Sequence, residues 1–195
     1  MSFSPLDPRT TALVLIDLQK GIAGPGRAPY SSEDVVANSK ALAERFRAAG
    51  APVFLVHVHW ARDYSDALNQ PVDEPSPRPE DGPPAGWADF VDGLRHPGDI
   101  VIHKRNWGAF HGTDLDLHLR RRGIKTLVLG GIATNFGVES TARDAWERNY
   151  NLILAEDACT TTSAEAHALA FTYVFPRISR IVKTAGVSLT DGPTG

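Results

Sequence analysis

The chain of 195 residues contains a single cysteine, Cys159. One thiol cannot form an internal disulfide or a metal site built from cysteines alone, and this fits a reducing compartment. No apolar run approaches the ~20 residues that a membrane-spanning helix needs. The first ten residues lack a basic stretch followed by an apolar one, so we expect no export signal. These absences predict a cytoplasmic protein that does not engage a membrane.

An excess of positive charge is also lacking. Twenty Lys and Arg residues stand against 23 Asp and Glu, and the net charge of −3 gives no electrostatic reason to expect a nucleic acid partner. The one basic cluster, residues 120–122, closes an expected helix, where it complements the helix dipole. With 42% hydrophobic and 22% charged residues the composition is that of a globular protein, and the length predicts one domain over residues 1–195.

Short, β-branched apolar runs alternate with helical patterns, which is typical of parallel β-α-β units. The runs are almost continuously hydrophobic, and this predicts strands that are covered on both faces. They lie at residues 12–16, 52–59, 99–103, 126–129, 151–155 and, more weakly, 180–182. We therefore expect a Rossmann-like three-layer α/β/α sandwich around a mainly parallel sheet of about six strands.

Four helices are expected between these runs, most of them marked by a capping side chain at the start and by Gly or Pro at the end. The first helix is expected from a cap at Ser31 or Ser32 to Gly50, and the second from Thr113 with Asp116 to Gly123. The third is expected to start near Phe136, and the fourth to start at Thr162 with Glu165 and to stop before Pro176.

One long connection, residues 61–98, interrupts this alternation with seven prolines and no clear helical pattern. Connections of this length are usually functional or disordered. Trp60 and Trp87 lie at its edge and inside it, and such aromatic residues favour an ordered lid or a subunit contact over a flexible linker.

Charged side chains follow two of the expected strands. In an open parallel sheet the ligand site lies beyond the carboxyl ends of the strands, where the strand order reverses. Asp17 follows five apolar residues and Lys104 follows the third run. Taken alone, Asp17 could cap a turn and Lys104 could be a solvated side chain. Brought to one rim, the two charges would shift each other's pKa values, which makes the pair a candidate catalytic site.

A glycine-rich turn, Gly130 to Gly137, follows the fourth run and leads into a helix. Backbone N–H groups at such a helix start can hold an anion or a developing oxyanion. The turn is not a dinucleotide-binding fingerprint, because the glycine spacing differs and it follows the fourth expected strand instead of the first.

At three places the sequence resembles the isochorismatase-like hydrolases, also called cysteine hydrolases. TALVLIDLQ is similar to the family's Asp-x-Gln segment, with Asp17 as the acid/base. HKRNWGAFHGTDL is similar to the segment that carries the family's lysine, here Lys104, and GIATNFGVESTARDA to the nucleophile loop. The resemblance implies the same fold, a small-molecule substrate and self-association into a homo-oligomer.

The sequence departs from the family at the nucleophile, because Gly137 stands where the amidohydrolases carry their cysteine. Glycine has no thiol and cannot form a thioester, so the covalent amidase mechanism is excluded. Glycine at this place resembles the true isochorismatases, which hydrolyse a vinyl ether without covalent catalysis. Cys159 follows a different expected strand, and we expect it to be a buried apolar side chain.

The resemblance therefore implies a cofactor-free hydrolase, with Asp17 as general acid/base and Lys104 as an orienting or substrate-binding cation. The alternative is a non-catalytic binding or scaffolding protein that kept the fold. The resemblance also implies a cis peptide bond between Ile132 and Ala133. The further residues that it implies for substrate or oxyanion binding are Gln19, Ala133, Thr134, Asn135, Phe136, Trp107 and Phe110.

Metal binding is not expected. Nicotinamidases of the family bind a divalent ion through an Asp and two His residues after the second strand. His57 and His59 share a face at a spacing of two, but no Asp-x-His accompanies them, so they should line a pocket wall or pack under the long connection. Candidate partners for substrate carboxylates are Arg62, Arg105 and Arg143.

Overall fold

The first strand, β1 (Thr11–Ile16), lies inside a sheet of six strands that all run parallel, in the order β3-β2-β1-β4-β5-β6. The computed structural model describes residues 4–190. The other strands are β2 (Val53–Val58), β3 (Ile100–Lys104), β4 (Thr126–Ile132), β5 (Asn151–Thr160) and β6 (Arg180–Val182). All six expected strands are confirmed, and the strand order reverses between β1 and β4, where ligands bind in such sheets.

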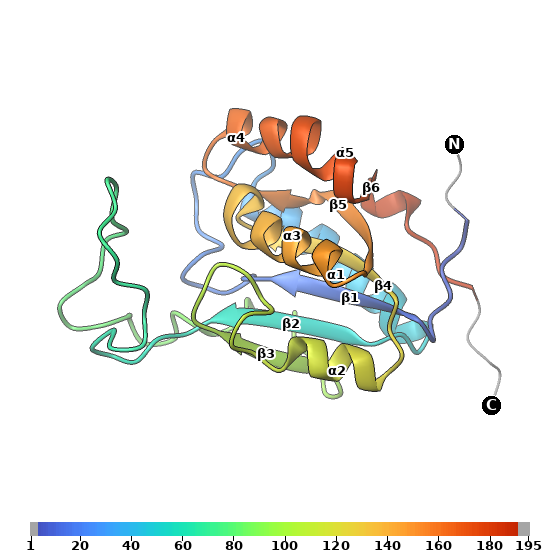
Figure 1. Ribbon diagram of the computed structural model, residues 1–195, viewed down its shortest axis with the longest axis horizontal. Helices are drawn as coiled ribbons and strands as arrows, with labels where there is room; N and C mark the ends of the chain where they lie inside the picture. Colours follow the sequence, from blue (N-terminus) through green and yellow to red (C-terminus); the bar gives the residue numbers. More distant parts are fainter. Residues whose placement is uncertain (1–3, 191–195) are drawn as a thin grey trace.

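Helices cover both faces of the sheet, which gives the expected three-layer α/β/α sandwich (Figure 1). Helix α1 (Ser32–Ala48) packs on one face, and the remaining helical segments lie on the other. Those segments are α2 (Leu115–Arg121), η1 (Thr134–Val138), α3 (Glu139–Glu147), α4 (Ala164–Leu169), η2 (Ala170–Val174) and α5 (Phe175–Ile178). A short turn near the end of the chain, η3 (Thr184–Gly186), contacts α1 instead, where Arg45 donates to the carbonyl of Thr184.

Strand β1 is buried over its whole length because both of its faces are covered. Leu13 and Leu15 belong to the core beneath α1, whereas Val14 and Ile16 belong to the core shared with α2 and α3. Burying a side chain of this size contributes roughly 1.5–3 kcal/mol. The hydrophobic strand therefore holds its own carboxyl end, and the residue that follows it, in a fixed place.

Strand β4 runs three residues beyond the expected end, as far as Ile132, because glycines let it approach β1 closely. Gly131 has φ +130°, and a Cβ there would lie 2.1 Å from the carbonyl oxygen of Ile16. Strand β5 likewise continues to Thr160. The glycine-rich turn is thus partly strand, and it brings the segment after β4 against the end of β1.

The helix starts differ from expectation at two places. Ser31 caps α1 as expected, by accepting a hydrogen bond from the N–H of Asp34. The expected capping box at Thr113 is wrong, because its hydroxyl donates to the Ala109 carbonyl and α2 begins later. Ser163, not Thr162, caps α4.

The last helical stretch also runs further than expected. It does not stop before Pro176, because the wide turn η2 leads into α5. The proline occupies the first turn of α5, where a backbone N–H is not needed for the helix.

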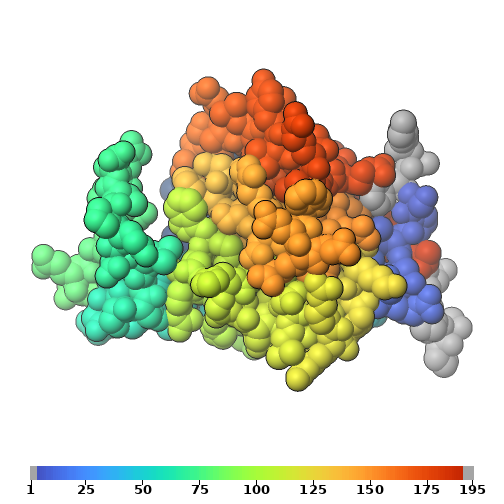
Figure 2. Space-filling model, viewed as in Figure 1, coloured from blue at the N-terminus to red at the C-terminus, as the bar shows by residue number. Residues whose placement is uncertain are grey.

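The connection of residues 61–98 contains no helix or strand, and its first part stands away from the body of the molecule as an arm (Figure 2). Trp60 and Trp87 close the base of this arm, with their ring centres 5.4 Å apart. An ordered lid or subunit contact stays a prediction. None of the helices within residues 4–190 has the length and apolar character needed to span a membrane.

Candidate active site

Asp17 and Lys104 meet at the carboxyl edge of the sheet as a buried ion pair. The Nζ of Lys104 lies 2.8 Å from Oδ2 of Asp17, and each residue is less than 5% exposed. β1 and β3 are not neighbours, so the long lysine side chain reaches across the end of β2. Asp17 has φ +52°, a left-handed conformation uncommon for a residue other than glycine, which turns the chain as β1 ends.

Lys104 is held by three acceptors. Besides the carboxylate, its Nζ donates to the carbonyl oxygens of Asn106 at 2.9 Å and Trp107 at 2.8 Å. An ammonium has three N–H donors, so all of them are used. Oδ1 of Asp17 is buried and has no hydrogen-bond partner within the described residues. This oxygen is therefore the open position of the pair, at which a reacting group could bind.

Burial raises the pKa of Asp17 from its ordinary 3.8 to about 6, although the charge and hydrogen bond of Lys104 lower it. The desolvation effect therefore exceeds the attraction of the lysine. A carboxyl group with a pKa near neutrality can act as an acid or as a base at physiological pH.

Gly137 lies directly against this carboxylate. A Cβ at position 137 would come 3.1 Å from Oδ2 of Asp17 and 3.0 Å from Cγ2 of Ile16. Both distances are tighter than ordinary contacts, so a side chain at position 137 would require these neighbours to shift by a few tenths of an ångström.

The loop after β4 carries a non-proline cis peptide bond between Ile132 and Ala133, the geometry that the resemblance implied. The carbonyl oxygen of Ala133 accepts hydrogen bonds from the N–H groups of Phe136 and Val138, both at 3.2 Å. The wide turn η1 that follows places Gly137 beside the ion pair.

Thr134 points away from the ion pair and towards a histidine that sequence reasoning missed. Its Oγ1 lies 2.9 Å from Nδ1 of His167 on α4, and both residues are buried. Nε2 of His167 lies 3.8 Å from a carboxylate oxygen of Glu156. Burial lowers the pKa of His167. The helical spacing of His167, Ala170 and Phe171 was the available signal that this histidine faces inward.

Two other expected substrate-binding residues have structural roles instead. Gln19 is fully buried, and its side-chain amide binds the backbone N–H and carbonyl of Val58 and the carbonyl of Trp87. Phe110 is a core residue that stacks on Tyr150 at 5.9 Å. A direct contact of either side chain with a substrate stays a prediction.

Three expected residues lie in the segments that flank the pair. Trp107 and Phe136 are partly exposed and meet edge to face, with ring centres 4.8 Å apart. Asn135 accepts a hydrogen bond from the hydroxyl of Thr161 at 2.7 Å. The aromatic pair can provide an apolar wall for a ligand that reaches Asp17.

The two histidines near the end of β2, His57 within the strand and His59 just after it, do not bond to each other. His57 donates from Nδ1 to the carbonyl of Ala88 in the long connection, as expected of a residue packed under it, and its other nitrogen faces His103. His59 is exposed. No group of three His, Cys, Asp or Glu side chains placed to hold a metal occurs among residues 4–190.

Of the arginines considered for substrate carboxylates, two already bind carboxylates of the chain. Arg105 pairs with Asp66 at 2.7 Å and Arg143 with Glu139 at 2.9 Å. Cys159 is fully buried in β5, as expected, and burial raises the pKa of its thiol above the usual range. It is therefore not a replacement nucleophile.

Known proteins match this chain over nearly its whole length. Residues 11–186 match the Isochorismatase domain. An uncharacterized isochorismatase family protein, YecD of Escherichia coli O157:H7, is 53% identical over 177 residues, which cover 90% of this chain and 93% of that protein. The ureidoacrylate amidohydrolase RutB of Methylobacterium radiotolerans is 36% identical over 184 residues, 83% of this chain and 71% of that one.

Among solved structures, an isochorismatase family protein from Burkholderia thailandensis superimposes with a TM-score of 0.88 at 47% identity. The match covers 94% of this chain and 95% of that chain. The domain match, the sequence identities and the shared fold agree. The chain belongs to the isochorismatase family of hydrolases.

Proposed function

We propose that the protein hydrolyses a small polar molecule without a covalent intermediate, with Asp17 as the general acid/base and Lys104 as the cation that orients it. The observation that carries the proposal is the buried ion pair at the end of β1, which faces Gly137 and leaves one carboxylate oxygen unpartnered. Since glycine offers no nucleophile, Asp17 must act on the substrate or on water.

The acidity of Asp17 supports this role. With a pKa of about 6, roughly a tenth of the molecules carry the proton at pH 7, which suffices for a general acid. Lys104 is fixed by two backbone carbonyls as well as by the carboxylate. It therefore holds Asp17 in one orientation while the proton moves.

Vinyl ether hydrolysis is the reaction that fits this arrangement best. The proton of Asp17 would pass to the terminal vinyl carbon, where the electrons of the double bond form the new C–H bond. The resulting oxocarbenium ion lies beside a carboxylate that has just become negative, which stabilises it. Water then adds to this ion and gives a proton back to the carboxylate of Asp17, and the neutral hemiketal collapses to a ketone and an alcohol as its hydroxyl proton passes to the leaving oxygen. No residue needs to form a covalent bond to the substrate.

A non-catalytic binding protein of the same fold is the second candidate. One observation favours it: Gly137 supplies no nucleophile, and a Cβ there would be in tight contact with Ile16 and Asp17. The match to a ureidoacrylate amidohydrolase points to amide substrates, but an amidase of the cysteine type needs the thiol that Gly137 lacks.

A cytoplasmic location, a small-molecule substrate and self-association complete the proposal. The location rests on the single cysteine, and self-association rests on the family resemblance. Size-exclusion chromatography with light scattering tests the last of these directly.

The test of function is pyruvate release from isochorismate, followed by a coupled lactate dehydrogenase assay. We expect turnover in the natural protein and in an Asp73→Asn control on the exposed arm, and none in Asp17→Asn. Activity should fall as pH rises above about 6, because the acid form of Asp17 is then lost.

Absence of both pyruvate release and ammonia release from amides would favour the binding protein. A Gly137→Cys variant provides a separate test, because it places a thiol at the family's nucleophile position. Amidase activity that appears only in this variant would mean that the amidase pocket persists and that glycine replaced a nucleophile.

A further inference from the structure

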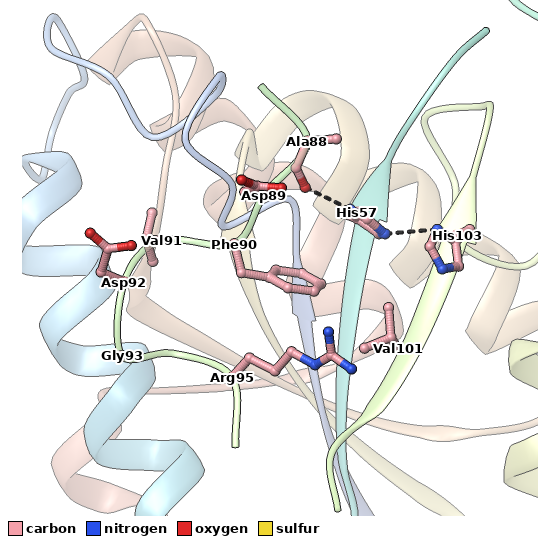
Figure 3. Close-up of a pocket in the computed structure, with 10 residues that line it drawn as sticks. All are labelled: His57, Ala88, Asp89, Phe90, Val91, Asp92, Gly93, Arg95, Val101 and His103. Atoms are coloured by element: carbon pink, nitrogen blue, oxygen red, sulfur yellow. Dashed lines mark hydrogen bonds between the residues drawn. The ribbon is translucent and has the colours of Figure 1, made fainter. Parts of the chain in front are cut away.

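A cavity lies on the face of the sheet opposite the ion pair. Its volume is about 420 Å³, and residues of β2, β3 and the connection after Trp87 line it (Figure 3). Neighbouring residues of a strand point to opposite faces. Val101 and His103 line the cavity, so Lys104 must point to the other face, where it meets Asp17. The cavity is therefore separate from the candidate active site.

An unpaired arginine enters this cavity. Figure 3 shows the side chain of Arg95 extending into it, with the guanidinium directed toward the space beneath the two histidines. Among residues 4–190 the structure gives this guanidinium no hydrogen bond and no ion pair. A free guanidinium has a planar set of N–H donors that matches a carboxylate in two-point contact.

Two hydrogen-bonded histidines, His57 and His103, form one wall of the cavity. His57 donates from Nδ1 to the carbonyl of Ala88 at 2.7 Å, since a carbonyl can only accept. Its Nε2 lies 2.8 Å from Nδ1 of His103, so the neutral pair shares one proton between these two nitrogens. Uptake of one more proton would give the pair a positive charge and an additional N–H donor.

The charges around the cavity favour an anion. Burial holds the pKa of His57 below its usual range, and the positive charge of Arg95 lowers it further. Two carboxylates lie at the rim. Asp92 is 92% exposed and pairs with Lys20 at 2.9 Å, and Asp89 is exposed, with its carboxylate on the far side of Phe90 from the guanidinium.

We propose that this cavity is a binding site for a small organic carboxylate. Arg95 forms the two-point contact with the carboxylate, and the His57–His103 pair supplies a further donor. Phe90 and Val101 provide the apolar wall against which the rest of the ligand packs. The apolar wall distinguishes an organic acid from inorganic phosphate, which gains nothing from it.

The loop over the cavity is bonded to the segment that follows Asp17. The N–H of Lys20 donates to the carbonyl of Asp89 at 2.8 Å, and the N–H of Val91 donates to the carbonyl of Leu18 at 3.1 Å. An occupant of the cavity therefore contacts a loop that is tied to the end of β1. Binding itself does not depend on the proposed hydrolase activity.

Isothermal titration of the full chain with benzoate tests the site, with benzyl alcohol as the uncharged probe of similar size. We expect one saturable site for benzoate, with affinity that rises as the pH falls from about 7 to about 5, where the lowered pKa of His57 places proton uptake, and no binding of benzyl alcohol. Arg95→Gln should weaken benzoate binding about tenfold or more, the loss of one charge-assisted contact. Arg121→Gln, which removes an exposed charge on α2, should leave the affinity unchanged.

His103→Gln should reduce the pH dependence while keeping the thermal midpoint of the natural protein, because this side chain is exposed. Equal affinity for the two probes, equal affinity in the Arg95→Gln variant, or no saturation up to about 10 mM benzoate would overturn the proposal.

Discussion

The carboxylate of Asp17 and the α-carbon of Gly137 are packed so closely that a Cβ at position 137 would lie 3.1 Å from Oδ2. The two residues come from segments 120 positions apart in the chain, joined by the pairing of β1 with β4. In a protein with a cysteine at this position the carboxylate would face a thiol. Here it faces backbone, so the proposed function requires Asp17 to act directly on a bound molecule.

Substitution of Gly137 by Ala should destabilise the fold by about 1–3 kcal/mol, because the methyl group would overpack against Ile16 and Asp17. Urea unfolding measures the change. Gly24→Ala is the matched control, since a Cβ there meets nothing within 4 Å. Equal stability of the two variants would show that the site adapts more easily than its geometry indicates.

Substitution of Lys104 by Met should cost about 3–5 kcal/mol, because it leaves the buried carboxylate of Asp17 without its partner. The loss should shrink as the pH falls, since protonation removes the uncompensated charge. Urea unfolding at pH 5 and pH 8 measures both effects, with Lys125→Met, an exposed lysine, as the control. A loss that is the same at both pH values would contradict the role of the pair.

The stability of the folded state should depend on the titration of Asp17. Its pKa rises from 3.8 to about 6 on folding, so the folded protein binds more protons between these values. The stabilisation from this group is therefore full below pH 4 and is lost as the pH rises through 6. The difference in unfolding free energy between the natural protein and Asp17→Asn, measured from pH 4 to pH 8, should follow this curve. A flat difference falsifies the assignment.

Removal of the His167 side chain should destabilise the loop that carries the cis peptide bond. In His167→Ala the buried hydroxyl of Thr134 loses its partner, at a cost of about 1–3 kcal/mol. A double-mutant cycle with Thr134→Val should give a coupling of about 0.5–3 kcal/mol. His111→Ala, at an exposed position, serves as the control. Additive effects in the cycle would mean that the two side chains act independently.

The thiol of Cys159 should be inert in the folded protein. It is fully buried, and burial raises its pKa, so neither the thiolate nor access to it is available. A chromogenic disulfide reagent should detect no thiol in the native protein and one per chain in urea. Fast reaction of the native protein would reopen the question of a second nucleophile.

Strand positions were the most predictable part of the fold, because each strand is covered on both faces and reads as an unbroken apolar run. The ends of β4 and β5 were less predictable. Gly130 and Gly131 look like a turn in sequence, yet they continue β4, since only residues without a Cβ can pass so close to Ile16. The continuation of the last helix past Pro176 was also hard to predict, because a proline usually ends a helix and is tolerated only in its first turn.

Within the candidate site, sequence could identify residue types but not the direction of their side chains. Gln19 and Phe110 lie near the expected place but point into backbone and core. His167 was missed because its partner, Thr134, is 33 residues away. The position of the unpaired guanidinium of Arg95 could not be predicted either, since only the packed loop places it near His57 and His103.

By itself the sequence determined the parallel sheet, the carboxylate at the end of its first strand and the loss of a side chain at position 137, because these follow from local hydrophobicity and residue identity. The tertiary structure alone decided how acidic Asp17 is. Its pKa reflects the loss of water around it set against one lysine at 2.8 Å, and both depend on how the segments pack. It also decided how closely Ile16 and Asp17 approach Gly137, since a distance of a few ångströms between distant segments has no local signature in the chain.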